Sequence, residues 1–212
     1  MTREGSATTA HAVMQLNAED GGNRTFIMVQ LPEKTDEKTE AYKAGYANIC
    51  EIGKERIRRA GKKILEENKD KEGIEKLDIG FRVLKLDDSN MNDIYYSPEL
   101  YTQSLLSTME SNIKSDRNDL DLLFACLIEM GYSLSLPYGS EQIETCAVHY
   151  YNYRGIIACF DKDIPDTVIK TIAKKKPAIT VFRDSSFADS PSKINVGEIF
   201  KLLSPDTTIK VI

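Results

Sequence analysis

The sequence lacks any long hydrophobic run. Its longest, Leu122–Ile128, has 7 residues and is bounded by Asp121 and Glu129, whereas a membrane-spanning helix needs about 18 or more. The amino-terminal residues Met1–Ser6 also lack the apolar stretch of a secretion signal. We therefore expect a cytoplasmic protein without a membrane segment.

Residues that hold metal ions are scarce as well. The chain has two histidines, His11 and His149, and its four cysteines stand singly, without a Cys-x-x-Cys pair. Structural zinc sites use closely spaced pairs of such residues, so we expect no metal site. Single cysteines are typical of a reducing compartment. We expect four reduced thiols, at Cys50, Cys126, Cys146 and Cys159.

Positive charge is not in excess. With 28 basic and 33 acidic residues the formal net charge is −5, which argues against a protein that coats nucleic acid with its whole surface. One predicted helix does carry a dense basic stretch, made of Lys54, Arg56, Arg58, Arg59, Lys62 and Lys63. These side chains spread over more than one helix face, so a solvated surface is favoured over a DNA-binding track.

Short apolar runs alternate with helical periodicity, a pattern typical of an α/β fold. Residues 1–90 are predicted to form a helix over 8–17, a buried strand over 26–29, a helix over 40–68 and a strand over 78–86. Ser6, Thr8 or Thr9 is expected to cap the first helix, and Gly21-Gly22 to end it. This order is half of a doubly wound fold whose first strand is missing.

The second half of the chain is predicted to be a separate lobe. Residues 91–117 form the connecting segment, with a helix over 98–113, and residues 118–212 form a small C-terminal α/β domain. Its expected elements are a helix over 120–130, hairpin strands over 143–151 and 155–160, a helix over 165–175, a strand over 178–182, a helix over 196–203 and a strand over 207–212.

The most informative stretch is Gly-Ser-Ala-Thr-Thr at 5–9, where the first helix begins. Small residues at a helix start let the backbone approach a ligand, and the exposed N–H groups there favour an anion. On these residues alone, a well-capped helix without a ligand is the more common interpretation.

Longer motifs carry a resemblance to a known family. They read Gly-Ser-Ala-Thr-Thr-Ala-His-Ala-Val-Met at 5–14, Asn-Arg-Thr-Phe-Ile-Met-Val-Gln-Leu-Pro-Glu at 23–33, Tyr-Lys-Ala-Gly-Tyr at 42–46, Ile-Gly-Lys-Glu-Arg-Ile-Arg-Arg-Ala at 52–60, Gly-Phe-Arg-Val-Leu-Lys-Leu at 80–86, Val-Phe-Arg-Asp-Ser-Ser-Phe at 181–187 and Lys-Ile-Asn-Val at 193–196. From residue 5 to 212 the chain resembles the modification (Mod) subunit of type III restriction–modification systems. These subunits are adenine-specific DNA methyltransferases that use S-adenosylmethionine.

The resemblance implies a partial methyltransferase (Rossmann-like) half that holds the cofactor, followed by a small C-terminal α/β domain. It places Gly5, Ser6, Thr8 and Thr9 in the turn that wraps the methionine part of S-adenosylmethionine. It places Gln30 at the ribose hydroxyls, with Leu31 against the adenine ring. Gln30 can donate and accept hydrogen bonds there, although a glutamine leaving a strand into a turn is an equally ordinary structural feature. The sequence departs from the family where Arg3 replaces a phenylalanine.

The chain also lacks the family's catalytic turn, a polar residue followed by Pro-Pro and an aromatic that receives the flipped adenine. None of its seven prolines is adjacent to another, and Leu136-Pro137-Tyr138 is the nearest imitation. We therefore expect no catalytic residue here, and a C-terminal portion of a larger subunit that is inactive alone.

The implied partners are DNA through the complete subunit, a second Mod subunit and the restriction (helicase–nuclease) subunit. The alternative hypothesis is a dimerisation or interaction module that binds neither cofactor nor DNA by itself. An exposed apolar surface left by the missing strand would favour self-association.

The remaining candidates each have an ordinary structural interpretation that we favour. His11 suits helix packing, Asp87 and Asp88 suit the end of a strand, and the tyrosines 150, 151 and 153 suit cross-strand packing rather than base stacking. The segment Arg183–Ser186 is a candidate contact with a partner, but its residues suggest no mechanism for such a contact.

Overall fold

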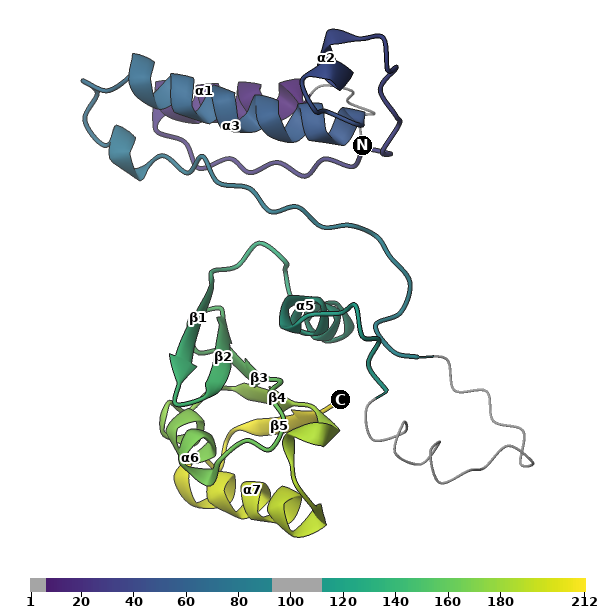
Figure 1. Ribbon diagram of the computed structural model, residues 1–212. Coiled ribbons are helices and arrows are strands. Elements are labelled where there is room, and N and C mark those ends of the chain that lie inside the picture. The colour runs from purple at the N-terminus through teal and green to yellow at the C-terminus, as the bar shows by residue number, and fades with distance from the viewer. Residues whose placement is uncertain (1–6, 93–111) are drawn as a thin grey trace. The chain divides into compact units, whose positions relative to one another are not determined.

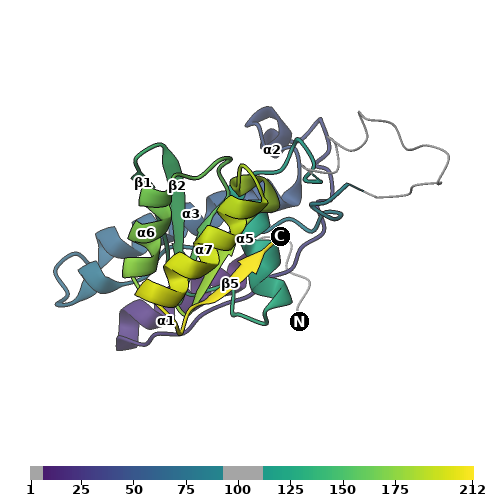
Figure 2. The same ribbon diagram turned by 90° about the horizontal axis from the view of Figure 1, so that it is seen from below.

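A computed structural model describes residues 7–92 and 112–212 (Figures 1 and 2). The chain forms two compact units, Met1–Leu84 and Lys85–Ile212. Most of the predicted connecting segment 91–117, including all but the last two residues of its helix over 98–113, lies outside the described residues. Within the described ranges, no helix combines the length and apolar character needed to cross a membrane.

The first unit is built on two helices that lie side by side (Figure 1). Helix α1, Thr8–Asp20, ends at Gly21, whose φ of 69° is the left-handed conformation that glycine adopts without strain. Its N-cap is Ala7, which has no side-chain acceptor, so the prediction that Thr8 or Thr9 caps the helix is wrong. Helix α3, Ile49–Glu67, shares a buried core with α1. That core contains Ala10, Met14, Ala18, Ile57, Ala60 and Ile64.

The helix predicted over 40–68 is in fact two helices. The short α2, Glu40–Lys43, stops before Gly45, whose φ of 93° is incompatible with a helix, and α3 begins only at Ile49. The Asn48 side chain starts α3 by accepting a hydrogen bond from Glu51 N at 3.1 Å. Gly45 and Asn48 were the local signals of this break, which the apolar periodicity concealed. A 3-10 turn, Ile74–Lys76, follows α3.

The strands predicted over 26–29 and 78–86 are extended segments without sheet pairing. Phe26 and Met28 pack against the helical core, whereas Ile27 is 95% exposed. A strand is stable when a neighbour satisfies its backbone hydrogen bonds. The described residues of this unit offer these two segments no such neighbour, so the expected parallel sheet is not formed by them.

The second segment nevertheless runs close to α3. A Cβ placed on Gly61 of α3 would lie 2.9 Å from the Ile79 Cβ, which is too close for an undisturbed contact. Glycine is therefore required at residue 61 for this segment to cover the helix.

The second unit contains a five-stranded mixed sheet in the order β1-β2-β3-β4-β5. Its strands are β1, Tyr138–Ile143; β2, Cys146–Tyr151; β3, Ile156–Cys159; β4, Ile179–Phe182; and β5, Thr208–Val211. The first three strands are antiparallel, and β3, β4 and β5 are parallel. The strand β1 was not predicted over this range, because its sequence is polar and five of its six residues are exposed at the sheet edge.

Helices cover both faces of this sheet, as Figures 1 and 2 show. Helix α6, Asp166–Lys174, and helix α7, Ser190–Leu203, lie on one face, and α5, Asp119–Glu129, lies on the other. Helix α7 begins earlier than predicted, since the Asp189 side chain caps it by accepting from Ser192 N at 2.8 Å. A 3-10 turn, Asp184–Ser186, follows β4. The mixed α/β class is therefore confirmed for this unit.

The contact between α5 and the sheet predicts a clear stability contrast. Leu127 is fully buried in this contact, whereas its neighbour Ile128 is 65% exposed. We expect Leu127→Ala to lower the free energy of unfolding by about 2–5 kcal/mol, and Ile128→Ala to change it by less than about 0.5 kcal/mol. Urea denaturation followed by circular dichroism measures both, and equal effects would contradict the packing of α5.

Candidate functional site

The predicted cofactor residue Thr8 lies at the start of α1 and contacts α3. Arg56 Nη1 donates a hydrogen bond to Thr8 Oγ1 at 3.1 Å. One turn earlier on α3, a Cβ on Gly53 would be 3.5 Å from the Ala7 Cβ, so the two backbones approach closely. The start of α1 is therefore held against the second turn of α3. Gly5 and Ser6 lie outside the described residues.

Gln30 lies against the first turn of the same helix. Its backbone oxygen accepts a weak hydrogen bond from Cys50 Sγ at 3.7 Å, and its side-chain Nε2 donates to Leu31 O at 3.0 Å. The other side-chain atom, Oε1, is buried and has no hydrogen-bond partner among residues 7–92 and 112–212. Buried polar atoms are normally paired, so this acceptor is the chemically conspicuous atom of the first unit.

Thr8 and Gln30 both contact helix α3. Their partners Arg56 and Cys50 are six residues apart, which corresponds to about 9 Å along a helix axis. Of the remaining predicted residues, Thr9 is half-buried and Leu31 is 58% exposed. The roles proposed for these residues stay predictions.

A cavity of about 400 Å³ opens beside α3 and does not include Gln30 or Leu31. It is lined by His11, Tyr46, Ile52, Glu55, Arg56, Arg59, Ala60 and Lys63. Arg59 Nε pairs with Glu55 Oε1 at 2.7 Å, and Arg59 Nη2 donates to Tyr46 Oη at 3.2 Å. The bond from Arg59 holds the pKa of Glu55 below its ordinary value. The lining carries three cations, Arg56, Arg59 and Lys63, and one carboxylate, Glu55. His11 has no nucleophilic side chain beside it in the lining.

The basic stretch of α3 forms ion pairs along its own helix. Arg58 also pairs with Glu55, at 3.8 Å, and Lys63 pairs with Glu67 at 3.5 Å. These exposed pairs at spacings of three and four residues support the interpretation as a solvated face.

Asp87 and Asp88 are engaged by cations within the second unit. Asp88 pairs with Lys114 at 3.0 Å and with Arg117 at 2.8 Å, and the hydrogen bond from Lys114 lowers the pKa of Asp88. Asp87 pairs with Lys85 at 3.2 Å. Both carboxylates therefore stabilise the start of this unit.

A hydrogen-bonded chain that the sequence did not indicate links α5 to the sheet. Both ring nitrogens of His149 on β2 form hydrogen bonds. Nδ1 bonds with Tyr138 Oη at 3.1 Å, and Nε2 bonds with Asp119 Oδ2 at 3.0 Å. The histidine is 7% exposed and its ring stacks on Tyr138. Residues 119 and 149 are thirty positions apart, so no local pattern reveals this pairing. With both nitrogens occupied, His149 docks the start of α5 on β2.

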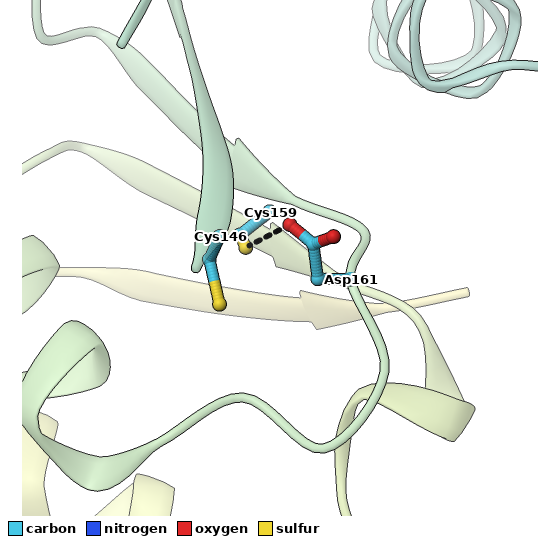
Figure 3. A group of neighbouring side chains, drawn as sticks. All are labelled: Cys146, Cys159 and Asp161. Carbon is cyan, nitrogen blue, oxygen red and sulfur yellow. Dashed lines mark hydrogen bonds between the residues drawn. The ribbon is translucent and has the colours of Figure 1, made fainter. Parts of the chain in front are cut away.

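A second cluster joins Cys146, Cys159 and Asp161, whose ligand atoms lie within 4.8 Å of one another. Figure 3 shows the Cys159 sulfur directed toward the Asp161 carboxylate, and Cys159 Sγ donates to Asp161 Oδ2 at 3.7 Å. The same oxygen accepts from Ala147 N at 2.6 Å, which extends the β2–β3 pairing beyond Cys159. Burial raises the pKa of the Cys159 thiol well above its ordinary value. In this structure the cluster joins β2 to the segment that follows β3, through the bonds from Ala147 N and Cys159 Sγ to the Asp161 carboxylate.

The other aromatic and polar candidates separate in the fold. Tyr151 is fully buried and donates to Ser133 O at 2.6 Å, whereas Tyr150 bonds Glu141 on the neighbouring strand. Tyr153 is 76% exposed at the β2–β3 turn. Arg183 ends β4, and its Nε is buried without a partner in the described residues.

Comparison with known proteins shows that segments of the chain are similar to type III restriction-modification Mod subunits. A segment of 64 residues is 55% identical to the type III restriction-modification enzyme StyLTI Mod subunit of Salmonella typhimurium, and covers 30% of this chain and 10% of that protein. A segment of 119 residues is 37% identical to the EcoP15I Mod subunit of Escherichia coli, over 49% and 16% of the two chains. A third, of 59 residues, is 48% identical to the EcoPI Mod subunit of Escherichia phage P1, over 28% and 9%.

The chain is therefore a partial homologue of type III restriction–modification Mod subunits, as its sequence motifs indicated. The matched segments span between about a tenth and a sixth of these curated relatives. No family model matches the chain.

The environments of the four thiols predict their reactivity. Cys50 is half-buried, whereas Cys126, Cys146 and Cys159 are buried, and burial raises the pKa of Cys126 and of Cys159. With an aromatic disulfide reagent at about pH 8, we expect Cys50 to react first and the others only on unfolding, because the thiolate is the nucleophile. Cys50→Ser should leave almost no fast-reacting thiol in the folded chain. Fast release from this variant would contradict the burial of the other three.

Proposed function

We propose that this chain carries part of the S-adenosylmethionine site of a type III adenine-specific DNA methyltransferase, together with an assembly domain. The proposal rests on the partial homology to Mod subunits and on one structural observation, the buried and unpartnered Gln30 Oε1. A buried acceptor without a donor is costly unless a ligand or water supplies one. In the proposed site, a ribose hydroxyl of S-adenosylmethionine donates to this atom.

The neighbouring residues are compatible with the other parts of that ligand. Leu31 offers an exposed apolar side chain next to Gln30, as an adenine ring requires. Thr8 and Thr9 are the first two residues of α1. They follow the N-cap residue Ala7, whose side chain offers no hydrogen-bond acceptor to the first turn. The resemblance also assigns Gly5 and Ser6, which lie outside the described residues, to the turn around the methionine part. When bound, S-adenosylmethionine would supply the methyl group, and these residues would only bind and orient it.

The catalytic turn of the family has no counterpart in this sequence, which contains no adjacent prolines. Adenine would have to be held by residues that this chain does not provide. We therefore propose that the chain by itself transfers no methyl group, and that DNA, a second Mod subunit and the restriction subunit are partners of the complete assembly. A cytoplasmic location and a Rossmann-like arrangement of the first unit belong to the same proposal.

A second candidate function is a non-catalytic interaction module. Ile27, Val29 and Leu31 alternate along one extended segment and are 95%, 54% and 58% exposed. Exposed apolar residues on an extended segment without strand neighbours favour association with another surface.

Calorimetric titration with S-adenosylmethionine distinguishes the two candidates. We expect saturable binding at millimolar ligand or below, and about tenfold weaker binding by Gln30→Leu, since one hydrogen bond to a buried acceptor is worth about 1.4 kcal/mol. The variant also removes an unpartnered acceptor, so its stability should change by less than about 1 kcal/mol. Gln15→Ala, which removes a side chain bonded to Glu19 on α1, is the matched control. Absence of binding by the unaltered chain would favour the interaction module.

A transfer assay tests the catalytic part of the proposal. The purified chain, incubated with radiolabelled S-adenosylmethionine and adenine-containing duplex DNA, should incorporate no label above a heat-treated sample. The physical reason is that no residue set of this sequence matches the pocket for a flipped adenine. Label appearing in the DNA would show that another part of the chain forms that pocket.

A further inference from the structure

Three loops of the second unit emerge at the end of the sheet where the parallel strands begin. The turn at 152–155 precedes β3, residues 175–178, directly after the last residue of α6, Lys174, precede β4, and residues 204–207 precede β5. Backbone hydrogen bonds join them, from Ile179 N to Gly155 O at 3.0 Å and from Thr208 N to Ala178 O at 2.9 Å. Because neighbouring strands lie about 4.8 Å apart, side chains on the first two loops project from one surface.

Three residues on these loops, Asn152, Tyr153 and Lys176, hold a left-handed backbone conformation. Asparagine adopts this conformation readily, whereas it is uncommon for tyrosine and lysine. Tyr153 has a φ of 59° in the β2–β3 turn, and Lys176 has a φ of 50° just after α6. Both places are commonly glycine, in a hairpin turn and after a helix end respectively. A large side chain is retained at each despite the strain. Such outliers are grounds for a functional hypothesis when the side chain is free to act.

Four side chains at or near Tyr153 and Lys176 are exposed, and three of them are positively charged. Tyr153 is 76% exposed, and Arg154, Lys176 and, at the end of α6, Lys174 are exposed as well. In the part of the chain that the structure describes, none of these three cations makes an ion pair, whereas the intervening Lys175 pairs with Glu141. We call Tyr153, Arg154, Lys174 and Lys176 the basic rim.

We propose that the basic rim binds the phosphate backbone of a nucleic acid, with Tyr153 stacking on a base. Cations without ion pairs next to an exposed aromatic ring are the combination that binds nucleic-acid strands. The phosphates pair with the cations, and every base offers a face for stacking. This surface lies in the second unit, so the proposal is independent of the proposed cofactor site.

The opposite end of the sheet differs in charge. The left-handed residues there are Glu144, in the β1–β2 turn, and Asp163, after β3. A chain of net charge −5 would repel a polyanion over much of its surface. The basic rim therefore attracts the nucleic acid locally, so that this end of the unit, and not the opposite end, faces it.

Fluorescence anisotropy with the full chain and labelled 20-nucleotide DNA, as a duplex and as a single strand, tests the proposal. Binding should weaken about fortyfold between 50 and 200 mM salt if three cations each neutralise one phosphate of a duplex. The triple variant Arg154→Ala, Lys174→Ala, Lys176→Ala should bind at least about tenfold more weakly and lose most of this salt dependence. The charge control is Lys162→Ala, an exposed lysine at the opposite end, which should bind normally.

The variant Tyr153→Gly separates binding from folding. Glycine relieves the left-handed strain, so the melting temperature should not fall, while loss of stacking should weaken single-strand binding by at least about fivefold. Glu144→Gly makes the same backbone change at the other end of the sheet and should leave binding unreduced.

Three results would overturn the proposal. They are absence of DNA binding by the unaltered chain, binding by the triple variant within twofold of normal, and polyglutamate competing as well as DNA with no effect of Tyr153→Gly. The last result would identify an acidic protein as the partner instead.

Discussion

Backbone hydrogen-bond pairing between extended segments is the constraint on which the structure depends. In the second unit every strand has a neighbour, and β2, β3 and β4 have one on each side. This pairing buries Ile156, Ile157 and Val181 completely between helices on both faces. In the first unit the extended segments have the same apolar character but no strand neighbours within the described residues, and Ile27 is left at 95% exposure. Similar sequence patterns thus give a sheet in one unit and two unpaired extended segments in the other. The reason is that a β-strand forms only when a second strand pairs with it.

The first unit is organised by α3 in place of a sheet. Cys50 contacts the segment that contains Gln30, whereas Gly53 and Arg56 contact the start of α1 at Ala7 and Thr8. Gly61, further along, admits Ile79 at a distance that any side chain would prevent. A helix can serve in this way because its side chains occupy fixed positions on a rigid cylinder. The proposed cofactor residues come from segments more than twenty positions apart, and both segments contact this helix.

The sequence predicted the features that are encoded locally. Gly21 ended α1 where expected, and the order of elements from β2 to β5 followed from apolar runs separated by helical periodicity. The break between α2 and α3 and the strand β1 were missed, since Gly45 and a polar edge strand give weak signals beside long periodic stretches. For the candidate site, the family motifs predicted a role for Gln30 that stays a prediction, and only the structure revealed that its Oε1 has no donor among the described residues. The link between His149 and Asp119 depends on tertiary packing, which no spacing rule contains.

The two proposed activities use different chemistry in different units, and this separation bears on how the chain works. An acceptor such as Gln30 Oε1 selects a neutral hydroxyl donor and is insensitive to salt, whereas the basic rim depends on charges that salt screens. Gln30 belongs to the first unit and the basic rim to the second. Cofactor affinity and nucleic-acid affinity should therefore respond independently to ionic strength. Weakening the contact with the polyanion by salt should not release the small ligand, because the two contacts differ in their physical basis.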